Sequence, residues 1–232
     1  MSASSASAVP VASATPNARA EFIRRTYMHV AVAILLFAIV EWLLLQWSGA
    51  QNLANRMTSG YTWLGVLLVF MIVSSFADRW ARSPGSTSKQ YAGFGVFILA
   101  EAVLFLPLLL AVSNQADDVL PSAALITLLL VIGLTAVVVL TRTDFSFLRS
   151  ALTIGGFIAL GLIVASIIFG FGLGLIFSVA MVAFAAGSVL YNTSNIMRTY
   201  RTDQPVAAAL ALFASIALLF WYIVRIVSSQ RR

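Results

Sequence analysis

Three polar side chains recur at helical spacing inside a long uncharged stretch of this sequence. Ser188, Asn192 and Asn195 are four and three residues apart, so on an α-helix they form one polar stripe. Polar groups in a membrane-like segment are costly, which makes a specific role the default expectation. Amides and hydroxyls exchange hydrogen bonds but do not lose a proton in the physiological range. The stripe therefore predicts hydrogen bonding across a helix interface.

A second stripe, near the end of the chain, offers a surface for the first. Ala207, Ala211 and Ser215 recur every four residues, and such small residues let two helices approach closely. A buried Asn needs partners for its carbonyl and its NH₂ group, and a Ser hydroxyl across the interface can supply one. Spacing alone favours a contact that holds two helices together, and a polar pathway is the alternative.

Two acidic residues fall inside apolar segments. Glu101 lies near the middle of "YAGFGVFILAEAVLFLPLLLAV", where an ionised side chain costs about 3 kcal/mol. It must face the interior of a bundle, and a role in a pathway or a proton response is favoured over a structural hydrogen bond. Glu41, beside Trp42 in the outer half of the first apolar segment, is interpreted as an interfacial, water-exposed carboxylate.

The residues needed for several kinds of catalysis are missing. His29 is the single histidine, placed at the start of the first apolar segment, and cannot by itself build a metal site or a triad. The chain has no cysteine, so it has no thiolate metal site and no cysteine nucleophile. There is no H-E-x-x-H motif and no pair of mid-membrane aspartates, and "GFGLG" is a weak glycine pattern between apolar segments. We expect no enzyme, no cofactor and no metal site. Scattered arginines and one lysine also argue against nucleic acid as a partner.

The composition identifies the elements that must position these residues. Hydrophobic residues make up 61% of the 232 and charged residues 9%, against about 45–50% and about 25% in soluble domains. The chain is predicted to be an all-α integral membrane protein in the lipid bilayer. Seven segments have the length of a membrane-spanning helix: about 28–47, 61–77, 92–112, 122–140, 150–170, 173–195 and 206–227.

The connections predict how the chain is oriented. Most Lys and Arg residues lie in the N-terminal flank and in the second, fourth and sixth connections, which places the N-terminus in the cytoplasm. With seven spans, the basic C-terminus would lie outside the cytoplasm. With six spans and one re-entrant segment near "FGFGLG", it would lie in the cytoplasm. Residues 1–20 are rich in Ser and Ala and are predicted to be a disordered tail before a membrane domain over 21–232.

An ordered series of motifs resembles the Bax inhibitor-1 family, specifically its bacterial members. The motifs cover Glu21 to Val227 and read "FIRRTYMHVAVA", "YAGFGVFILAEAVLFLP", "GLTAVVVLTRTDFSFLRSAL", "FGFGLGLIFSVAMVAFAAGSVLYNTSNI" and "TDQPVAAALALFASIALLFWYIVRI". The resemblance implies a seven-helix bundle in the inner cell membrane, with the last helix surrounded by the other six. It also implies a pH-sensitive calcium leak.

The family's proton-sensing pair is altered in this chain. The resemblance implies one aspartate in a sixth-helix motif like "LYDTSNI" and another in a seventh-helix motif like "LYLDIxNLF", which share a proton. Asn192 and Ser215 occupy these two positions here. They can form the hydrogen-bonded, uncharged state but cannot titrate, so we expect a contact that does not depend on pH. Glu101, and after it Glu41, remain as candidates for any pH response.

Two functions follow as hypotheses. The first is passive conduction of cations, with Ca²⁺ as the candidate ion, when the last helix moves away from a polar seam. That seam is predicted to contain Ser188, Asn192, Asn195, Ser215 and Glu101. The second is a non-conducting regulatory protein that binds another membrane protein, such as a membrane protease, or modulates a stress response.

Overall fold

The computed structural model describes residues 9–113 and 118–230, and within them the regular secondary structure is helical, without a strand. A short 3₁₀ turn, η1 (Val11–Ser13), precedes the α-helices. They are α1 (Pro16–Gln46), α2 (Ala50–Thr58), α3 (Thr62–Ala81), α4 (Thr87–Ser113), α5 (Val119–Thr141), α6 (Leu148–Phe169), α7 (Leu175–Arg198) and α8 (Pro205–Ser229). Among the described residues, all of these except the short α2 are long and apolar enough to cross a membrane, 7 in total. The predicted all-α membrane bundle is confirmed.

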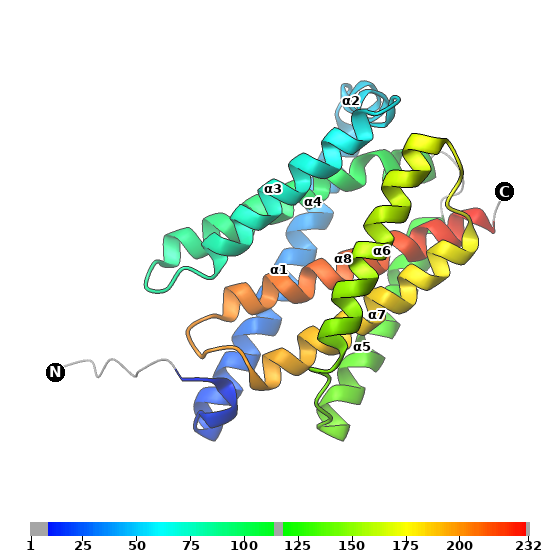
Figure 1. The fold of residues 1–232 in the computed structure, drawn as a ribbon. Helices are drawn as coiled ribbons and strands as arrows, with labels where there is room; N and C mark the ends of the chain where they lie inside the picture. The colour runs from blue at the N-terminus through cyan, green and yellow to red at the C-terminus, as the bar shows by residue number, and fades with distance from the viewer. Residues whose placement is uncertain (1–8, 114–117, 231–232) are drawn as a thin grey trace.

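The last helix occupies the middle of the bundle. In Figure 1, α8 crosses the centre of the molecule, and it packs against α1, α3, α4, α5 and α7. Of the residues in its most apolar stretch, 72% are buried inside the protein. Five consecutive residues, 206–210, are buried, so every face of this first part of the helix meets protein. The prediction of a central last helix is confirmed, but five other helices, and not the expected six, pack closely on it, because α6 packs mainly on α7.

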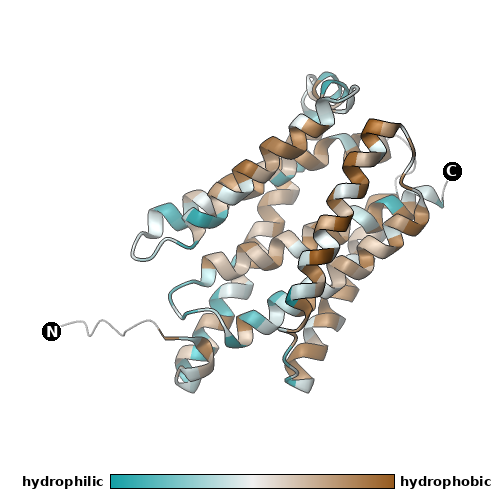
Figure 2. Ribbon diagram, viewed as in Figure 1, coloured by the Kyte–Doolittle hydropathy of each residue, from teal (hydrophilic) through white to brown (hydrophobic). Residues whose placement is uncertain are grey.

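The outer helices turn apolar side chains away from the bundle. Figure 2 shows brown, hydrophobic residues along the flanks of the helices, with teal, hydrophilic residues gathered mostly near the helix ends. This is the distribution that a bilayer requires, because lipid tails solvate apolar side chains and exclude polar ones.

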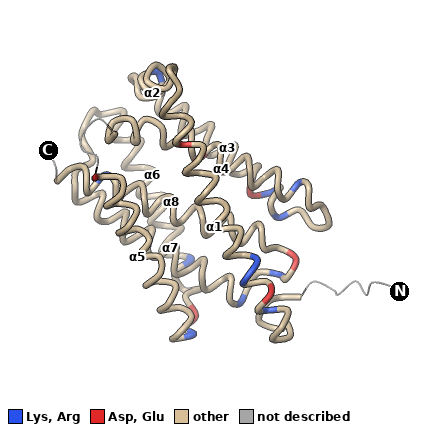
Figure 3. Tube along the Cα trace, turned by 180° about the vertical axis from the view of Figure 1, so that it is seen from behind, with Lys and Arg blue, Asp and Glu red and all other residues tan. Residues whose placement is uncertain are grey.

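One end of the bundle gathers four segments that are distant in the sequence. The backbone N–H of Val11 donates to the carbonyl of Tyr200 at 2.8 Å, and the N–H of Phe145 donates to the hydroxyl oxygen of Ser194 at 3.1 Å. The guanidinium of Arg82, at the end of α3, lies 5.7 Å from the centre of the Tyr200 ring. The N-terminal turn and the α3–α4, α5–α6 and α7–α8 connections therefore meet there. Figure 3 shows many of the Lys and Arg residues at this end. We call it the basic end.

The prediction of a disordered tail over 1–20 does not hold for residues 9–20. Val11 is fully buried, and α1 already begins at Pro16. The helix start has a local cause: the hydroxyl of Thr15 accepts a hydrogen bond from the N–H of Ala18 at 3.4 Å, and proline suits the first helical position. Residues 1–8 lie outside the described part of the chain.

The described residues contain α6 and α7 as two separate helices, and each is a candidate span. α6 has 22 residues and α7 has 24, so each can cross by itself. Gly170, with φ +71°, ends α6 in the left-handed conformation that glycine adopts at little cost and starts the reversal into α7. The N- and C-terminal ends of the described chain lie at opposite sides of the view in Figure 1. The helix α2, between the first two spans, was not predicted.

Candidate functional site

The two polar stripes meet between α7 and α8. The amide nitrogen of Asn192 donates to the hydroxyl oxygen of Ser215 at 2.8 Å and approaches the carbonyl of Ala211 at 3.3 Å. The Ser215 hydroxyl donates to that same carbonyl, one turn earlier on its own helix, at 3.1 Å. Because the Ser proton is used within α8, its oxygen is left to accept the amide proton. The result is a closed, uncharged group of three partners.

Small residues make this contact possible. Ala207 on α8 is fully buried, and the structure pairs α7 and α8 along much of their length. With methyl groups at Ala207 and Ala211, the backbones come close enough for a short Asn side chain to span the gap. The local sequence therefore determines both the spacing of the helices and the hydrogen bond between them.

A cavity of about 370 Å³ opens beside this contact, toward the basic end. We call it the Asn192 cavity; its lining includes Asn192, Asn195 and Ala211, together with Arg82 and Arg149. The guanidinium of Arg82 bonds both carboxylate oxygens of Asp78, at 2.8 and 2.9 Å. Arg82 is thus largely neutralised, so Arg149 supplies the main positive charge in the lining.

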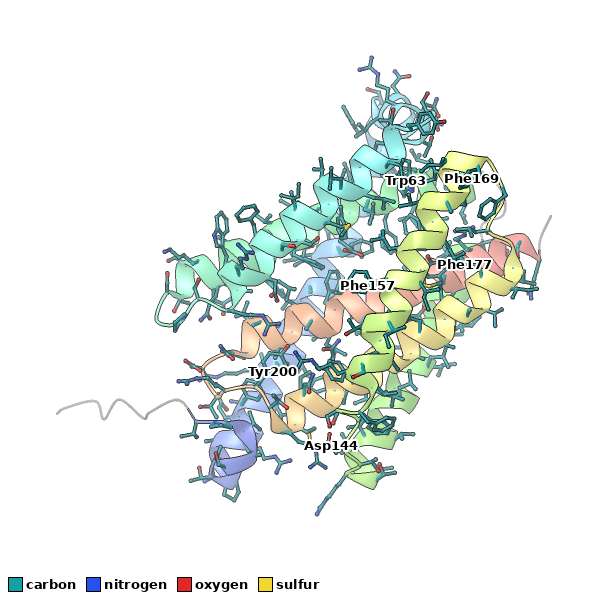
Figure 4. All side chains as sticks on the ribbon, viewed as in Figure 1. Trp63, Asp144, Phe157, Phe169, Phe177 and Tyr200 are labelled. Atoms are coloured by element: carbon teal, nitrogen blue, oxygen red, sulfur yellow. The ribbon has the colours of Figure 1, made fainter. Side chains whose placement is uncertain are left out.

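Tyr200 forms another part of the wall of the Asn192 cavity, at the connection between α7 and α8 (Figure 4). Its ring lies under the Arg82 guanidinium, 5.7 Å from it. Burial raises the pKa of the Tyr200 phenol above its ordinary value. The group therefore stays protonated and acts as a neutral hydroxyl in the wall.

A second cavity of about 350 Å³ lies further along α8, away from the basic end. We call it the Glu101 cavity, since Glu101, only 6% exposed, is the acidic residue in its lining. α3, α4, α6 and α8 all contribute to it, and Trp63 of α3 is labelled in Figure 4. Arg225 closes one side: it donates to the carbonyl of Leu173 at 3.2 Å and lies 5.9 Å from the ring of Tyr222.

Ser215 stands between the two cavities. On α8, Ala211 lines the Asn192 cavity and Leu218 lines the Glu101 cavity. Positions 211 and 218 are seven residues apart, which is almost two helical turns. They therefore share a face of α8 and lie about 10 Å apart along its axis. The Asn192–Ser215 hydrogen bond falls within that interval. It belongs to the layer of protein that separates the cavities.

The structure divides the predicted polar seam. Asn192, Asn195 and Ser215 lie together at the α7–α8 contact, whereas Glu101 belongs to the other cavity. Ser188 is half-buried on α7 and is not part of the lining of either cavity. The backbone carbonyl of Asn195 accepts a hydrogen bond from the N–H of Thr199, 2.8 Å long, at the end of α7.

The interpretation of Glu41 as a water-exposed carboxylate is wrong. Its side chain is buried in the protein, with 4% exposure, and both carboxylate oxygens lack a hydrogen-bond partner among the described residues. The cause is the length of α1: the helix continues to Gln46, and its neighbour Trp42, 61% exposed, takes the outer face. Glu41 therefore points inward, where it interacts electrostatically with Glu101 of α4, and lines neither cavity.

Sequence reasoning missed a cluster of three hydroxyl groups. Tyr27 of α1 faces Thr135 of α5 and Thr193 of α7, and the three hydroxyl oxygens are buried without a well-formed hydrogen bond in the described chain. Thr193 follows Asn192 directly but is rotated about 100° around the helix. No spacing within one helix relates residues from three helices, so only the fold brings them together.

Comparisons with known proteins agree with this architecture. A family model described as "Inhibitor of apoptosis-promoting Bax1" matches residues 19–232. An uncharacterized protein of Pseudomonas aeruginosa, PA2604, is 37% identical over 205 residues, which cover 85% of this chain and 84% of the relative. The match includes all seven long apolar helices apart from the first residues of α1. This chain belongs to the Bax inhibitor-1 family of multi-pass membrane proteins.

Proposed function

We propose that this protein is a passive cation leak in the inner membrane, with its N-terminus in the cytoplasm and Ca²⁺ as the candidate ion. The observation that carries the proposal is the position of Ser215 between two cavities that approach α8 from opposite ends of the bundle. A path through the protein needs only the intervening layer, about two helical turns thick, to open. Movement of α8 against α7 would break the Asn192–Ser215 bond and join the cavities.

The Glu101 cavity has the chemistry to attract a cation. A carboxylate is the strongest oxygen ligand that a protein offers to Ca²⁺. Glu101 is accompanied there by the hydroxyls of Ser166 and Tyr222. Within the described residues, no three His, Cys, Asp or Glu side chains gather to hold a metal ion. The arrangement therefore favours brief, weak coordination, as conduction requires.

The Asn192 cavity limits the rate of such a leak. Arg149 in its lining lowers the local concentration of cations, and Arg82 contributes less because Asp78 pairs with it. We expect a slow, ohmic leak and no rapid channel current.

The closed contact should not depend on pH. Neither an amide nor a hydroxyl exchanges its proton near neutrality, so acidification changes nothing between Asn192 and Ser215. Two aspartates at these positions would repel when both are ionised and would share a proton when one is neutral. Their introduction should create a pH-dependent latch.

The test is Ca²⁺ flux into dye-loaded liposomes that contain the purified protein, at pH 6, 7 and 8. The native protein should conduct with a rate that changes by less than about twofold, whereas a variant with Asn192→Asp and Ser215→Asp should change by about tenfold over this range. A matched control carries Ser88→Asp and Ser150→Asp, two exposed residues outside both cavities. The control adds the same charge at the same end and should behave like the native protein.

A second function is supported by the same closed contact. A bundle whose two cavities are separated by a fixed hydrogen bond also suits a non-conducting regulator that binds a membrane protease or another membrane protein. If the native protein gives no Ca²⁺ flux while the double Asp variant conducts, the leak is excluded and this regulator is favoured. Stoichiometric co-purification of one membrane partner in mild detergent would then be the expected result.

A further inference from the structure

A third cavity, larger than the Asn192 and Glu101 cavities, lies at the basic end, between the first turns of α1 and the ends of α5 and α7. Its volume is about 550 Å³, and three guanidinium groups, from Arg19, Arg142 and Arg198, come to it from three different elements. Thr143 adds a hydroxyl, and no acidic residue takes part in the lining. It is separate from the Asn192 and Glu101 cavities, so the proposed conduction does not use it.

These three arginines differ from others at the same end. Arg24, Arg25, Arg82 and Arg201 each contact a carboxylate. No carboxylate of the described chain lies within ion-pair distance of the three arginines in the cavity. Asp144 acts electrostatically on Arg198 from outside the lining and offsets one charge in part. A surplus of about two positive charges remains.

The placement of Arg19 is informative because it opposes the helix dipole. Arg19 lies near the N-terminus of α1, and the first turn of this helix has no acidic residue. A cation near a helix N-terminus is unfavourable because the helix dipole is positive there. The Arg19 side chain makes no hydrogen bond with a described residue, so no internal contact compensates that cost. An external anion in the cavity would do so.

Arg142 and Arg198 are held by the backbone at the end of α5. Arg142 has φ +52°, an uncommon value for a residue with a side chain, and its N–H donates to the carbonyl of Val138 at 3.0 Å. Its own carbonyl accepts a hydrogen bond from the Arg198 guanidinium. This contact uses one donor of the five on Arg198 and leaves others for a ligand.

We propose that this cavity binds the phosphate headgroup of an anionic phospholipid. Guanidinium groups bind phosphate oxygens in pairs, and basic pockets between membrane helices are suited to such headgroups. The cavity lies at the ends of two candidate spans, since α5 ends at Thr141 and α7 at Arg198, which is where a lipid headgroup would be met. Val138, Val139 and Met197 form an apolar wall that would meet the start of the acyl chains. A free phosphate ion would leave that wall unused.

The experiment is native mass spectrometry of the full-length protein in detergent, titrated with phosphatidylglycerol and, separately, with phosphatidylcholine. One phosphatidylglycerol should bind at least about tenfold more tightly than phosphatidylcholine. Replacing Arg19, Arg142 and Arg198 together by Gln should weaken phosphatidylglycerol binding about 100-fold, and Arg19→Gln alone about fivefold. Because the Arg19 side chain makes no internal hydrogen bond, the single variant keeps the test valid if the triple variant does not fold.

A matched variant separates a built site from general surface charge. Arg24→Gln, Arg25→Gln and Arg201→Gln remove the same three charges from the same end but leave the cavity intact, and phosphatidylglycerol affinity should stay within about twofold. Equal losses in the two triple variants would overturn the proposal, as would equal binding of the two lipids. Displacement of the lipid by millimolar inorganic phosphate would identify a site for the free anion and would overturn the lipid assignment.

Discussion

α6 and α8 are almost equally apolar, yet they have opposite positions in the molecule. Of the residues in the most apolar stretch of each, 72% are buried in α8 and only 6% in α6. α8 is enclosed by five other helices, whereas α6 packs mainly on α7 and turns Ile154, Phe157 and Ile158 outward. In Figure 4, Phe157 is labelled midway along α6.

The difference shows what hydropathy measures in a membrane protein. Lipid tails are as apolar as leucine, so burial against protein brings no additional hydrophobic gain over exposure to lipid. The central position of α8 depends on fit: alanines close to the backbone, interlocking aromatic rings and one interhelical hydrogen bond. α6 also has small residues, and Gly155 lies against the ring of Phe184. This close packing occurs on one face of α6 only. Packing, and not apolarity, distinguishes the two helices.

The largest expected effect comes from removing a ring from the centre. Phe213 of α8 is 2% exposed and meets Phe37 and Phe97 at 5.9 and 6.2 Å between ring centroids. Phe213→Ala should lower the free energy of unfolding by about 3 kcal/mol, since it leaves a cavity. Phe157→Ala on α6, where the ring is 73% exposed, should change it by less than about 0.5 kcal/mol. Thermal unfolding in one detergent measures both, and equal losses would break the comparison.

The next effect tests the close approach of α7 and α8. Ala207→Leu inserts three heavy atoms where no space is left, because Ala207 is fully buried. We expect a loss of about 2 kcal/mol in the free energy of unfolding. Ala151→Leu, on an exposed position of α6, should be close to neutral. A tolerated Leu at position 207 would show that the helices can separate without cost.

A smaller effect isolates the hydrogen bond between the helices. A double-mutant cycle with Asn192→Ala and Ser215→Ala should give a coupling free energy of about 0.6 kcal/mol, the average for such bonds in membranes. Ser166 of α6 bonds within its own helix, to the carbonyl of Ile163 at 2.8 Å. A cycle of Ser166→Ala with Asn192→Ala should therefore give no coupling. Coupling in the second cycle would point to a general loosening of the bundle.

The smallest effect concerns the turn that leads into α6. A hydrogen bond from the Ser146 N–H, 2.9 Å long, is the main reason why the pKa of the Asp144 carboxyl lies below its ordinary value. Because the folded pKa is the lower one, this stabilisation is present above the unfolded pKa of about 3.9 and is lost as the pH falls through the folded value. Asp144 is exposed to solvent, so the effect is slight.

Hydrogen exchange at the start of α6 measures it. Protection of amides 146–152 should fall modestly between pH 5 and pH 3 in the native protein, after correction for the intrinsic exchange rate. Asp144→Asn keeps an oxygen that can accept the Ser146 N–H but cannot titrate, so its protection should stay near the native value at pH 5 and show no such pH dependence. An unchanged profile in that variant would assign the pH dependence to another group.

Several features were predictable because they depend on neighbours along the chain. Segment length and apolarity predict the seven spans, and the i, i+4 spacing of polar and small residues predicts that Asn192 and Ser215 face each other. The central place of the last helix was expected from the family resemblance, not from hydropathy. The start of α1 was missed although its signals, Thr15 and Pro16, are local, since a Ser- and Ala-rich tail was interpreted as disordered.

The sequence by itself determined the class of protein, the seven candidate spans and the pairing of two groups without charge, Asn192 and Ser215, between α7 and α8. Only the tertiary structure decided that Glu41 is buried, that Glu101 and Asn192 line different cavities, and that three arginines from distant segments share one pocket. The physical reason is that a helix of known sequence can turn any face toward protein or lipid at similar hydrophobic cost. Which face turns inward depends on how side chains of several helices fit together, and that fit exists only in three dimensions.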